Sequence, residues 1–142
     1  MIDTKIVLPI YMQLPIKYKK ILKKKDDWLY TVPINFNEQR QMSRFTYPRI
    51  KIAFTEHVKE QVEWLKLKSP ISITYNLYYR NKSSDLNNWV SVVDKFFADT
   101  LQKAWCIEDD NVLHVVQSVH NVIEQDTKNP RIEVHIQEDF KL

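Results

Sequence analysis

The fold of this chain is decided by residues 85–110, which read DLNNWVSVVDKFFADTLQKAWCIEDD. At about 100° per residue, the large apolar side chains of this stretch fall on one broad helical face. They are Leu86, Trp89, Val92, Val93, Phe96, Phe97 and Leu101. Ser83, Ser84 or Asp85 can accept a hydrogen bond from the free amides of the first turn, which marks the helix start. The stretch therefore predicts an amphipathic helix with one buried face.

The polar face of this predicted helix carries the candidate chemistry. Asn87 and Asp94 are seven residues apart and lie within roughly 20° of each other, and Asn88 and Lys95 form a second such pair. The acidic pair Asp109 and Asp110 follows the helix and is expected to open a hairpin or strand. Grouped carboxylates typically bind a divalent cation, and oxygen ligands with retained waters favour Mg²⁺.

The remaining periodicity predicts an α+β fold, with a small mixed or antiparallel sheet and helices packed on one face. Pro9 and Pro15 interrupt an apolar strand or arm, and Pro33 places its strand at a sheet edge. Thr55 is expected to cap a second helix. The expected strands are 6–16, 28–34, 71–79, 111–120 and 130–136, the second helix is 55–66, and a polar turn covers 124–129.

Two basic segments are candidate nucleic-acid contacts. Residues 18–25 (YKKILKKK) carry five lysines, in a basic N-terminal extension or arm over residues 1–27, and form either a solvated face or a phosphate-contacting patch. Residues 35–51 are predicted to be a long loop in which aromatic side chains alternate with four cations, Arg40, Arg44, Arg49 and Lys51. Such a loop suits backbone contact and base stacking, although an ordinary surface loop is the alternative.

Composition limits the classes of protein to which the chain can belong. Its 142 residues suit one domain, and 44% hydrophobic residues argue against disorder. The absence of glycine excludes a glycine-rich phosphate-binding loop. The single cysteine, Cys106, is expected to be buried and fits a reducing cytoplasm. Neither a membrane span nor a signal peptide is expected, and the four histidines show no zinc-site spacing.

The combination of Asp85-Leu-Asn-Asn88, the helix around Asp94 and Lys95, and Asp109-Asp110-Asn-Val resembles the RusA family of Holliday-junction resolvases. The similarity is greatest to divergent members from bacteriophages and prophages. It extends more weakly to residues 32–35 and 129–134, so it covers most of the chain beyond residue 30. The resemblance implies a RusA-like fold, a homodimer, and Mg²⁺-dependent cleavage of branched DNA, with Mn²⁺ as a plausible substitute.

The resemblance and the helical geometry together suggest roles for individual residues. Asp85 and Asp110 are expected to be direct metal ligands, with Asp109 and, by helical geometry, Asp94 as further or water-mediated ligands. Lys95 is the candidate cation near the scissile phosphate, and Asn87 and Asn88 are expected to support the site. The simpler alternatives are that Asp85 only caps the helix, that Asp94 is only a solvated position, that Asn88 is only a polar residue of the N-terminal turn, and that Asp109 and Asp110 only form a turn.

Two positions depart from the family pattern. Asn87 stands where the better-known members have a second aspartate, and Ser91 stands where they have the helix lysine. Asp94 and Lys95 can replace these groups only if Asp109 and Asp110 pack near the middle of the helix, because seven residues rise about 10 Å.

Three functions remain open at this point. The first is a Mg²⁺-dependent endonuclease for four-way DNA junctions. The second is a non-catalytic junction-binding protein whose metal site has decayed. The third is an interaction domain of a phage recombination module, which would show no salt-sensitive affinity for DNA.

Overall fold

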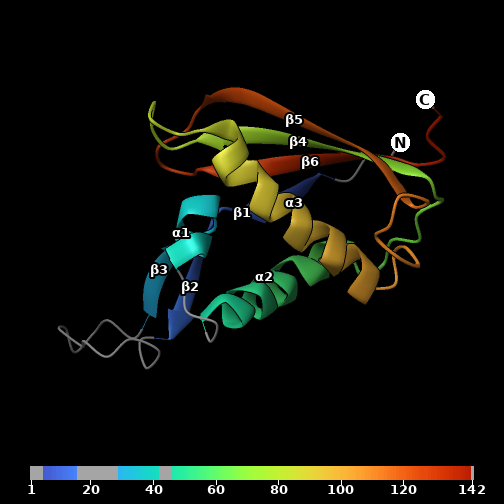
Figure 1. The fold of residues 1–142 in the computed structure, drawn as a ribbon, viewed down its shortest axis with the longest axis horizontal. Helices are drawn as coiled ribbons and strands as arrows, with labels where there is room; N and C mark the ends of the chain where they lie inside the picture. Colours follow the sequence, from blue (N-terminus) through green and yellow to red (C-terminus); the bar gives the residue numbers. More distant parts are fainter. Residues whose placement is uncertain (1–4, 16–28, 42–45, 142) are drawn as a thin grey trace.

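The computed structural model describes residues 5–15, 29–41 and 46–141, and they form the predicted α+β fold. A four-stranded sheet has the order β1-β6-β4-β5, with β1 Ile6–Pro9, β6 Arg131–Gln137, β4 Ile71–Tyr79 and β5 Val115–Gln125. β4 and β5 are parallel, and the other two pairings are antiparallel, so the sheet is mixed. The helices lie together on one side of this sheet (Figure 1). The expectation for fold class is confirmed.

The predicted strand over residues 6–16 is divided at Ile10. β1 joins the large sheet, whereas β2 Tyr11–Pro15 pairs with β3 Leu29–Pro33 in a separate two-stranded sheet. The Ile34 amide donates to the Ile10 carbonyl at 2.8 Å, so the bend is held from the end of β3. Pro33 closes an edge strand, as predicted. Residues 18–25 lie outside the described residues, as does most of the predicted extension 1–27.

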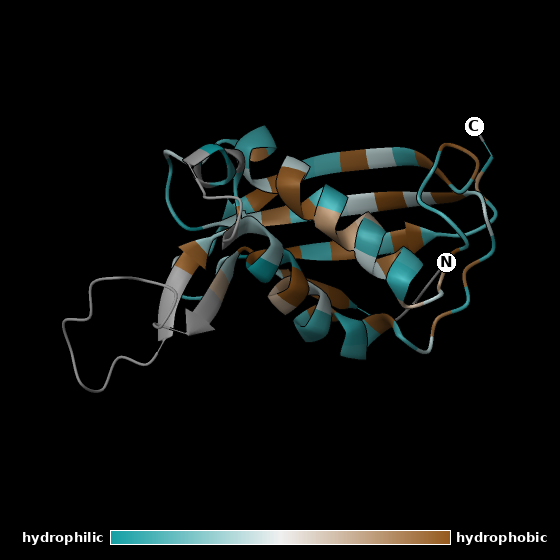
Figure 2. Ribbon diagram, turned by 60° about the horizontal axis from the view of Figure 1, so that its bottom comes forward, coloured by the Kyte–Doolittle hydropathy of each residue, from teal (hydrophilic) through white to brown (hydrophobic). Residues whose placement is uncertain are grey.

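The predicted central helix is α3, Leu86–Lys103. Asp85 is its N-cap and accepts from the Asn87 amide at 3.1 Å. The buried face carries the predicted residues Trp89, Val92, Val93, Phe96, Phe97 and Leu101, together with Val90 and Thr100. In Figure 2, hydrophobic and hydrophilic positions alternate along the sheet strands beside this helix. The core therefore lies between the sheet and α3, with α2 completing it.

The prediction of a long loop over residues 35–51 is wrong. α1 covers Phe36–Gln41, and α2 covers Thr46–Val62 rather than 55–66. Pro48 is tolerated because it lies in the first turn of α2, where amides have no helical acceptor. Thr55 is not a cap but lies in mid-helix, with Oγ1 3.4 Å from Thr100 Oγ1. The overlooked signal is the four-residue spacing of Ile50, Phe54, Val58 and Val62, all of which are buried.

β5 begins four residues later than predicted and extends to Gln125. Residues 111–114 form a turn, because the Asn111 side chain accepts from the Leu113 amide and its carbonyl accepts from the His114 amide. The predicted turn at 124–129 accordingly begins at Asp126. Strand β4 has the predicted bounds, and β6 begins one residue later than predicted.

Two further expectations can be compared with the described part of the chain. Cys106 is buried, and its thiol donates to the Val62 carbonyl at 3.1 Å. Burial raises the pKa of this thiol, which makes it a poor nucleophile, as predicted. Among residues 5–15, 29–41 and 46–141, no helix is both long and apolar enough to cross a membrane.

Candidate active site

An open groove of about 460 Å³ runs between the middle of α3 and the start of β5. Three of the predicted site residues, Asp94, Lys95 and Asp110, line it together. The complete lining is Ser91, Asp94, Lys95, Ala98, Asp110, Val115, Val116, Gln117 and Ser118. Asp110 therefore packs near the middle of the helix, where Asp94 and Lys95 must lie if they are to replace the missing aspartate and lysine. We call this feature the α3–β5 groove.

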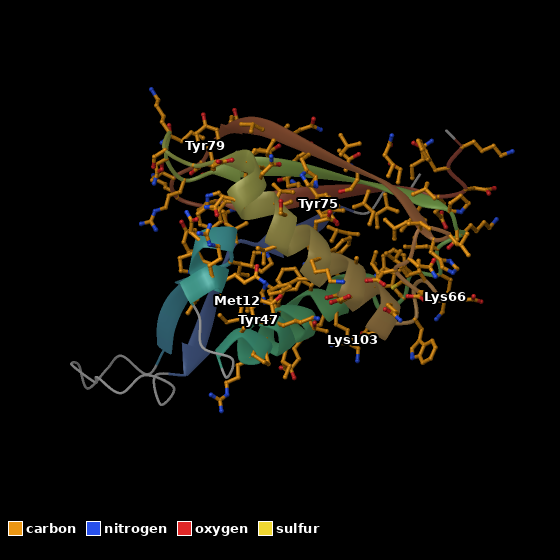
Figure 3. The ribbon with its side chains drawn as sticks, in the orientation of Figure 1. Met12, Tyr47, Lys66, Tyr75, Tyr79 and Lys103 are labelled. Carbon is orange, nitrogen blue, oxygen red and sulfur yellow. The ribbon has the colours of Figure 1, made fainter. Side chains whose placement is uncertain are left out.

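Asp94 is fixed by side chains from the sheet. The hydroxyl of Tyr75, which is fully buried on β4, donates to Oδ1 at 2.6 Å, and Ser118 Oγ donates to Oδ2 at 3.0 Å. His120 Nε2 lies 3.5 Å from the same Oδ2 and 2.9 Å from Ser118 Oγ. Figure 3 shows Tyr75 where β4 passes α3. The Asp94 carboxylate is thus held in one orientation at the groove wall.

Asp110 belongs to a compact cluster of charges. Lys95 Nζ lies 3.7 Å from both Asp110 Oδ2 and Asp99 Oδ1. Lys51 Nζ, from α2, lies 2.5 Å from Asp99 Oδ2. The Lys95 side chain is 65% exposed, whereas those of Asp99 and Asp110 are 14% and 22% exposed. Lys95 is therefore the cation of this cluster that remains accessible to a ligand.

The pKa values of the two carboxyl groups in the cluster are shifted in opposite directions. The hydrogen bond between Asp110 and Asp99, followed by partial burial, raises the pKa of Asp110, and the nearby Lys95 only partly opposes this. Burial also disfavours charge on Asp99, but hydrogen bonds from Lys51 and Asp110 outweigh it and lower the Asp99 pKa. Asp99 is therefore the more acidic of the two groups.

Asp85, Asn87 and Asn88 lie at the start of α3, outside the lining of the α3–β5 groove. About 15 Å of helical rise separates position 85 from position 95, so the structure does not bring Asp85 to Asp110. The Asp85 carboxylate caps α3, and Asn88 Oδ1 accepts from the Asn37 amide in the first turn of α1 at 2.9 Å. The contacts of Asp85 and Asn88 thus match the simpler alternatives, a helix cap and a polar residue of the N-terminal turn.

Asp109 supports the turn that presents Asp110. Its Oδ1 accepts from the Asp110 amide at 2.7 Å, and its Oδ2 accepts from Asn111 Nδ2 at 3.2 Å. Asp109 is not part of the groove lining, so it adjoins the candidate ligand rather than facing the same space. Its role as a further ligand stays a prediction.

The predicted DNA-contact residues are distributed over two helices. Arg40 lies in the last turn of α1 and Arg49 in the first turns of α2, and both are exposed. Lys51 is less accessible because its ammonium contacts Asp99. Arg44 lies outside the described residues.

Asp94 and Asp110 are the groove residues that could hold a divalent cation. In the described part of the chain, no three carboxylate, imidazole or thiolate groups are placed to hold a metal by themselves. Mg²⁺ commonly uses only one or two carboxylates and completes its shell with water and substrate phosphate. Asp94 and Asp110 line the same open groove, so they could supply two such carboxylates.

Sequence reasoning missed four groups that shape the groove, namely Asp99, Tyr75, Ser118 and His120. Asp99 had a local signal, because it stands four residues after Lys95 on the same helix. Ser118 and His120 alternate along β5 and so share one face. Nothing local connects Tyr75 to Asp94, because their contact depends on how α3 crosses β4.

The sequence matches no protein-family model and no curated protein.

Proposed function

We propose that the chain is a Mg²⁺-dependent endonuclease that hydrolyses phosphodiester bonds at four-way DNA junctions, with its active site in the α3–β5 groove. The observation that carries the proposal is the shared groove lining of Asp94, Lys95 and Asp110. Two carboxylates and an accessible ammonium are the groups that phosphoryl transfer with a metal requires. The preference for branched DNA and the homodimer rest on the resemblance to the RusA family, because paired cuts need two sites related by a two-fold axis.

The chain contributes three actions at this site. Tyr75 and Ser118 hold the Asp94 carboxylate in place, so little reorganisation accompanies ligand binding. Asp110 supplies a second carboxylate, and its raised pKa means that it ionises at a higher pH than an ordinary aspartate. Lys95 extends its exposed ammonium toward the groove and can stabilise charge on the scissile phosphate. Bound Mg²⁺ would supply Lewis-acid polarisation of the phosphoryl oxygen and activation of a water.

The first test is cleavage of a synthetic four-way junction with and without Mg²⁺. We expect nicks only with the metal, and weaker or altered cleavage when Mn²⁺ replaces it. Asp110→Asn and Asp94→Asn should each reduce the cleavage rate by at least about a hundredfold while junction binding stays intact or strengthens, because a ligand and a repulsive charge are both lost.

Two control variants make this test specific. Asp139→Asn removes a charge at an exposed position outside the groove lining, and asparagine tolerates the positive φ of 50° found there, so cleavage should be unchanged. Asp85→Asn distinguishes the groove from a site at the helix start. Cleavage that is lost with Asp85→Asn and retained with Asp94→Asn would place the active site at the helix start.

The Asn87→Asp variant tests whether Asp94 replaces the aspartate that is missing at position 87 or whether the site has lost its activity. Asn87→Asp should have little effect if Asp94 supplies the carboxylate. Activation by Asn87→Asp together with a silent Asp94→Asn would show a decayed site. Junction binding without cleavage under all metal conditions would instead support the non-catalytic binding protein.

A salt titration tests the DNA-contact residues. Arg40→Gln and Arg49→Gln should weaken binding to all sequences, and each lost phosphate contact should reduce the slope of log K against log salt by roughly 0.9. Lys51→Gln should change this slope less, because Lys51 already contacts Asp99. Unchanged slopes in both arginine variants would remove α1 and α2 from the DNA interface.

A further inference from the structure

His120 is a partly buried histidine at the α3–β5 groove to which the proposed function gives no role. The parallel pairing of β4 and β5 sets it directly opposite Tyr75, and the two rings meet edge to face with their centroids 5.6 Å apart. The His120 side chain is 21% exposed. Ser118 stands two residues earlier on β5, so the two side chains share the face of the strand that contacts Asp94 on α3.

The side chains of Ser118 and His120 converge on one oxygen of Asp94. Ser118 Oγ lies 3.0 Å from Asp94 Oδ2, and His120 Nε2 lies 2.9 Å from Ser118 Oγ and 3.5 Å from the same Oδ2. The other oxygen, Oδ1, accepts from the Tyr75 hydroxyl at 2.6 Å. Within the described residues, the His120 ring has no other hydrogen bond. Its polar contacts are therefore confined to this triangle.

The number of hydrogens in the triangle determines the direction of its bonds. A serine hydroxyl has one hydrogen to donate, and an ionised carboxylate has none. Without a hydrogen on Nε2, the Ser118 hydroxyl could serve only one of its two neighbours, and Nε2 would face Asp94 Oδ2 as a second acceptor. With a hydrogen on Nε2, His120 donates to Ser118 and Ser118 donates to Asp94. Each hydrogen bond then joins a donor to an acceptor.

We propose that His120 carries its hydrogen on Nε2 and is a positioning residue for Asp94, acting through Ser118. This inference rests on the proposed function, in which Asp94 is a metal ligand. A serine hydroxyl rotates freely unless a second partner fixes it. The donor from His120 occupies a lone pair of Ser118 Oγ and leaves its hydrogen directed at Asp94 Oδ2. The carboxylate thus meets an incoming cation in the orientation that the sheet gives it.

The first measurement examines the ring directly and needs neither metal nor DNA. Nitrogen NMR of the neutral imidazole distinguishes a hydrogen on Nε2 from one on Nδ1. The chain has four histidines, and the signal that disappears in His120→Gln belongs to His120. We expect the form with the hydrogen on Nε2. A ring with its hydrogen on Nδ1 overturns the proposal, whatever the activity of the chain.

The second measurement compares the Mg²⁺ requirement of junction cleavage among three variants. His120→Leu removes the donor, whereas His120→Gln keeps an amide N–H that can reach Ser118. His135→Leu is the matched control, because His135 is an exposed histidine opposite Thr74, on the sheet face away from Asp94. Urea unfolding of each variant checks that the fold is intact.

We expect His120→Leu to raise the Mg²⁺ concentration for half-maximal cleavage about tenfold, because groups that orient a metal ligand typically contribute at least this factor. His120→Gln and His135→Leu should stay close to the original requirement. Rescue by glutamine separates positioning from packing, since a residue that only fills space would not need a donor. A leucine variant with the original Mg²⁺ requirement, or a glutamine variant as impaired as leucine, overturns the proposal.

Ser118→Ala tests whether His120 acts through the serine. This variant should raise the Mg²⁺ requirement by itself, and adding His120→Leu to it should raise the requirement little further, because the chain of bonds is already broken. Independent, multiplying effects of the two substitutions would show that His120 does not act through Ser118, and would overturn the proposal.

Contrary outcomes separate this inference from the proposed function. A chain that cleaves junctions with the original Mg²⁺ requirement in His120→Leu loses only the positioning role, and the endonuclease stands. If the original chain does not cleave junctions at any Mg²⁺ concentration, the proposed function fails, and the role of His120 in positioning a metal ligand fails with it.

Discussion

At position 94, a carboxylate that helical periodicity places on a polar face is fixed by side chains from two strands. Tyr75 has no water to bind, because its side chain is fully buried, so Asp94 satisfies a donor as well as lining the groove. Burial, followed by the charge and the hydrogen bond of Asp94, raises the tyrosine pKa well above its ordinary value. The hydroxyl therefore stays protonated and can donate to Asp94 at neutral pH.

We expect Tyr75→Phe to lower the free energy of unfolding by about 2 kcal/mol, since a hydrogen bond to a charged acceptor is lost. The ring of residue 75 keeps its contacts with Phe97 and His120, whose ring centroids lie 6.1 Å and 5.6 Å from that of Tyr75. Urea unfolding measures the change. Tyr79→Phe on the same strand is the control, because within the described residues the Tyr79 hydroxyl has no hydrogen-bond partner. Equal stability of the two variants would contradict this role for Asp94.

Among the elements, β1 shows how a helix can close the edge of a sheet. Gln61 on α2 donates from Nε2 to the Val7 carbonyl at 2.7 Å and accepts from the Val7 amide at 2.8 Å. The side-chain amide thus replaces the partner strand that an edge would otherwise lack. The same contact fixes α2 against the sheet, and the Lys51–Asp99 ion pair separately joins α2 to α3.

Gln61→Glu tests this closure with minimal change of shape. A carboxylate can still accept from the Val7 amide, but it cannot donate to the carbonyl. We expect a loss of about 1–2 kcal/mol in the free energy of unfolding. Gln61→Leu, which loses both bonds, should cost more and should speed hydrogen exchange of the Val7 amide. Unchanged exchange in Gln61→Leu would show that α2 does not close this edge.

Across the whole molecule, a network of charges on the sheet face opposite the helices joins the start of β1 to β6 and the β5–β6 turn. Arg131 contacts Glu133 at 2.8 Å and Asp126 at 2.7 Å, and Lys5 contacts Glu133 at 3.0 Å. The guanidinium also lies over the Tyr78 ring, 4.0 Å from its centroid. Burial disfavours charge on Glu133, but hydrogen bonds from Lys5 and Arg131 outweigh it and lower its pKa.

The lowered pKa of Glu133 predicts a loss of stability in acid. Its contribution is fully present above the ordinary glutamate pKa and is lost as the pH falls through the lower pKa of the folded state. Glu133→Gln should be destabilising by about 2 kcal/mol at neutral pH and should flatten the acid dependence of the free energy of unfolding. Thermal or urea unfolding between neutral and acidic pH measures both. The exposed Glu60→Gln should retain the original dependence, and an equal slope in Glu133→Gln would contradict the network's role.

The sequence by itself determined the elements whose signal is local. Helix α3, its Asp85 cap and strand β4 follow from periods of 3.6 and 2 that packing does not override. The four-residue spacing of apolar residues from Ile50 to Val62 is also a local signal for α2. The start of this helix was not predicted, because the arginines and aromatic residues there were interpreted as a loop. The candidate site was predicted in part, because the sequence identified Asp94, Lys95 and Asp110 without showing that they share a groove.

Only the tertiary structure decided which carboxylates meet. Asp85 and Asp110 bound the same stretch of sequence, yet Asp85 lies at the start of α3. The turn before β5 returns Asp110 to Lys95 and Asp99, which begin about 15 Å of helical rise further along. The same packing set Tyr75 under Asp94 and left Trp105 in solvent. These contacts depend on the angle at which α3 crosses the sheet, and that angle is fixed by the packed core as a whole rather than by any segment.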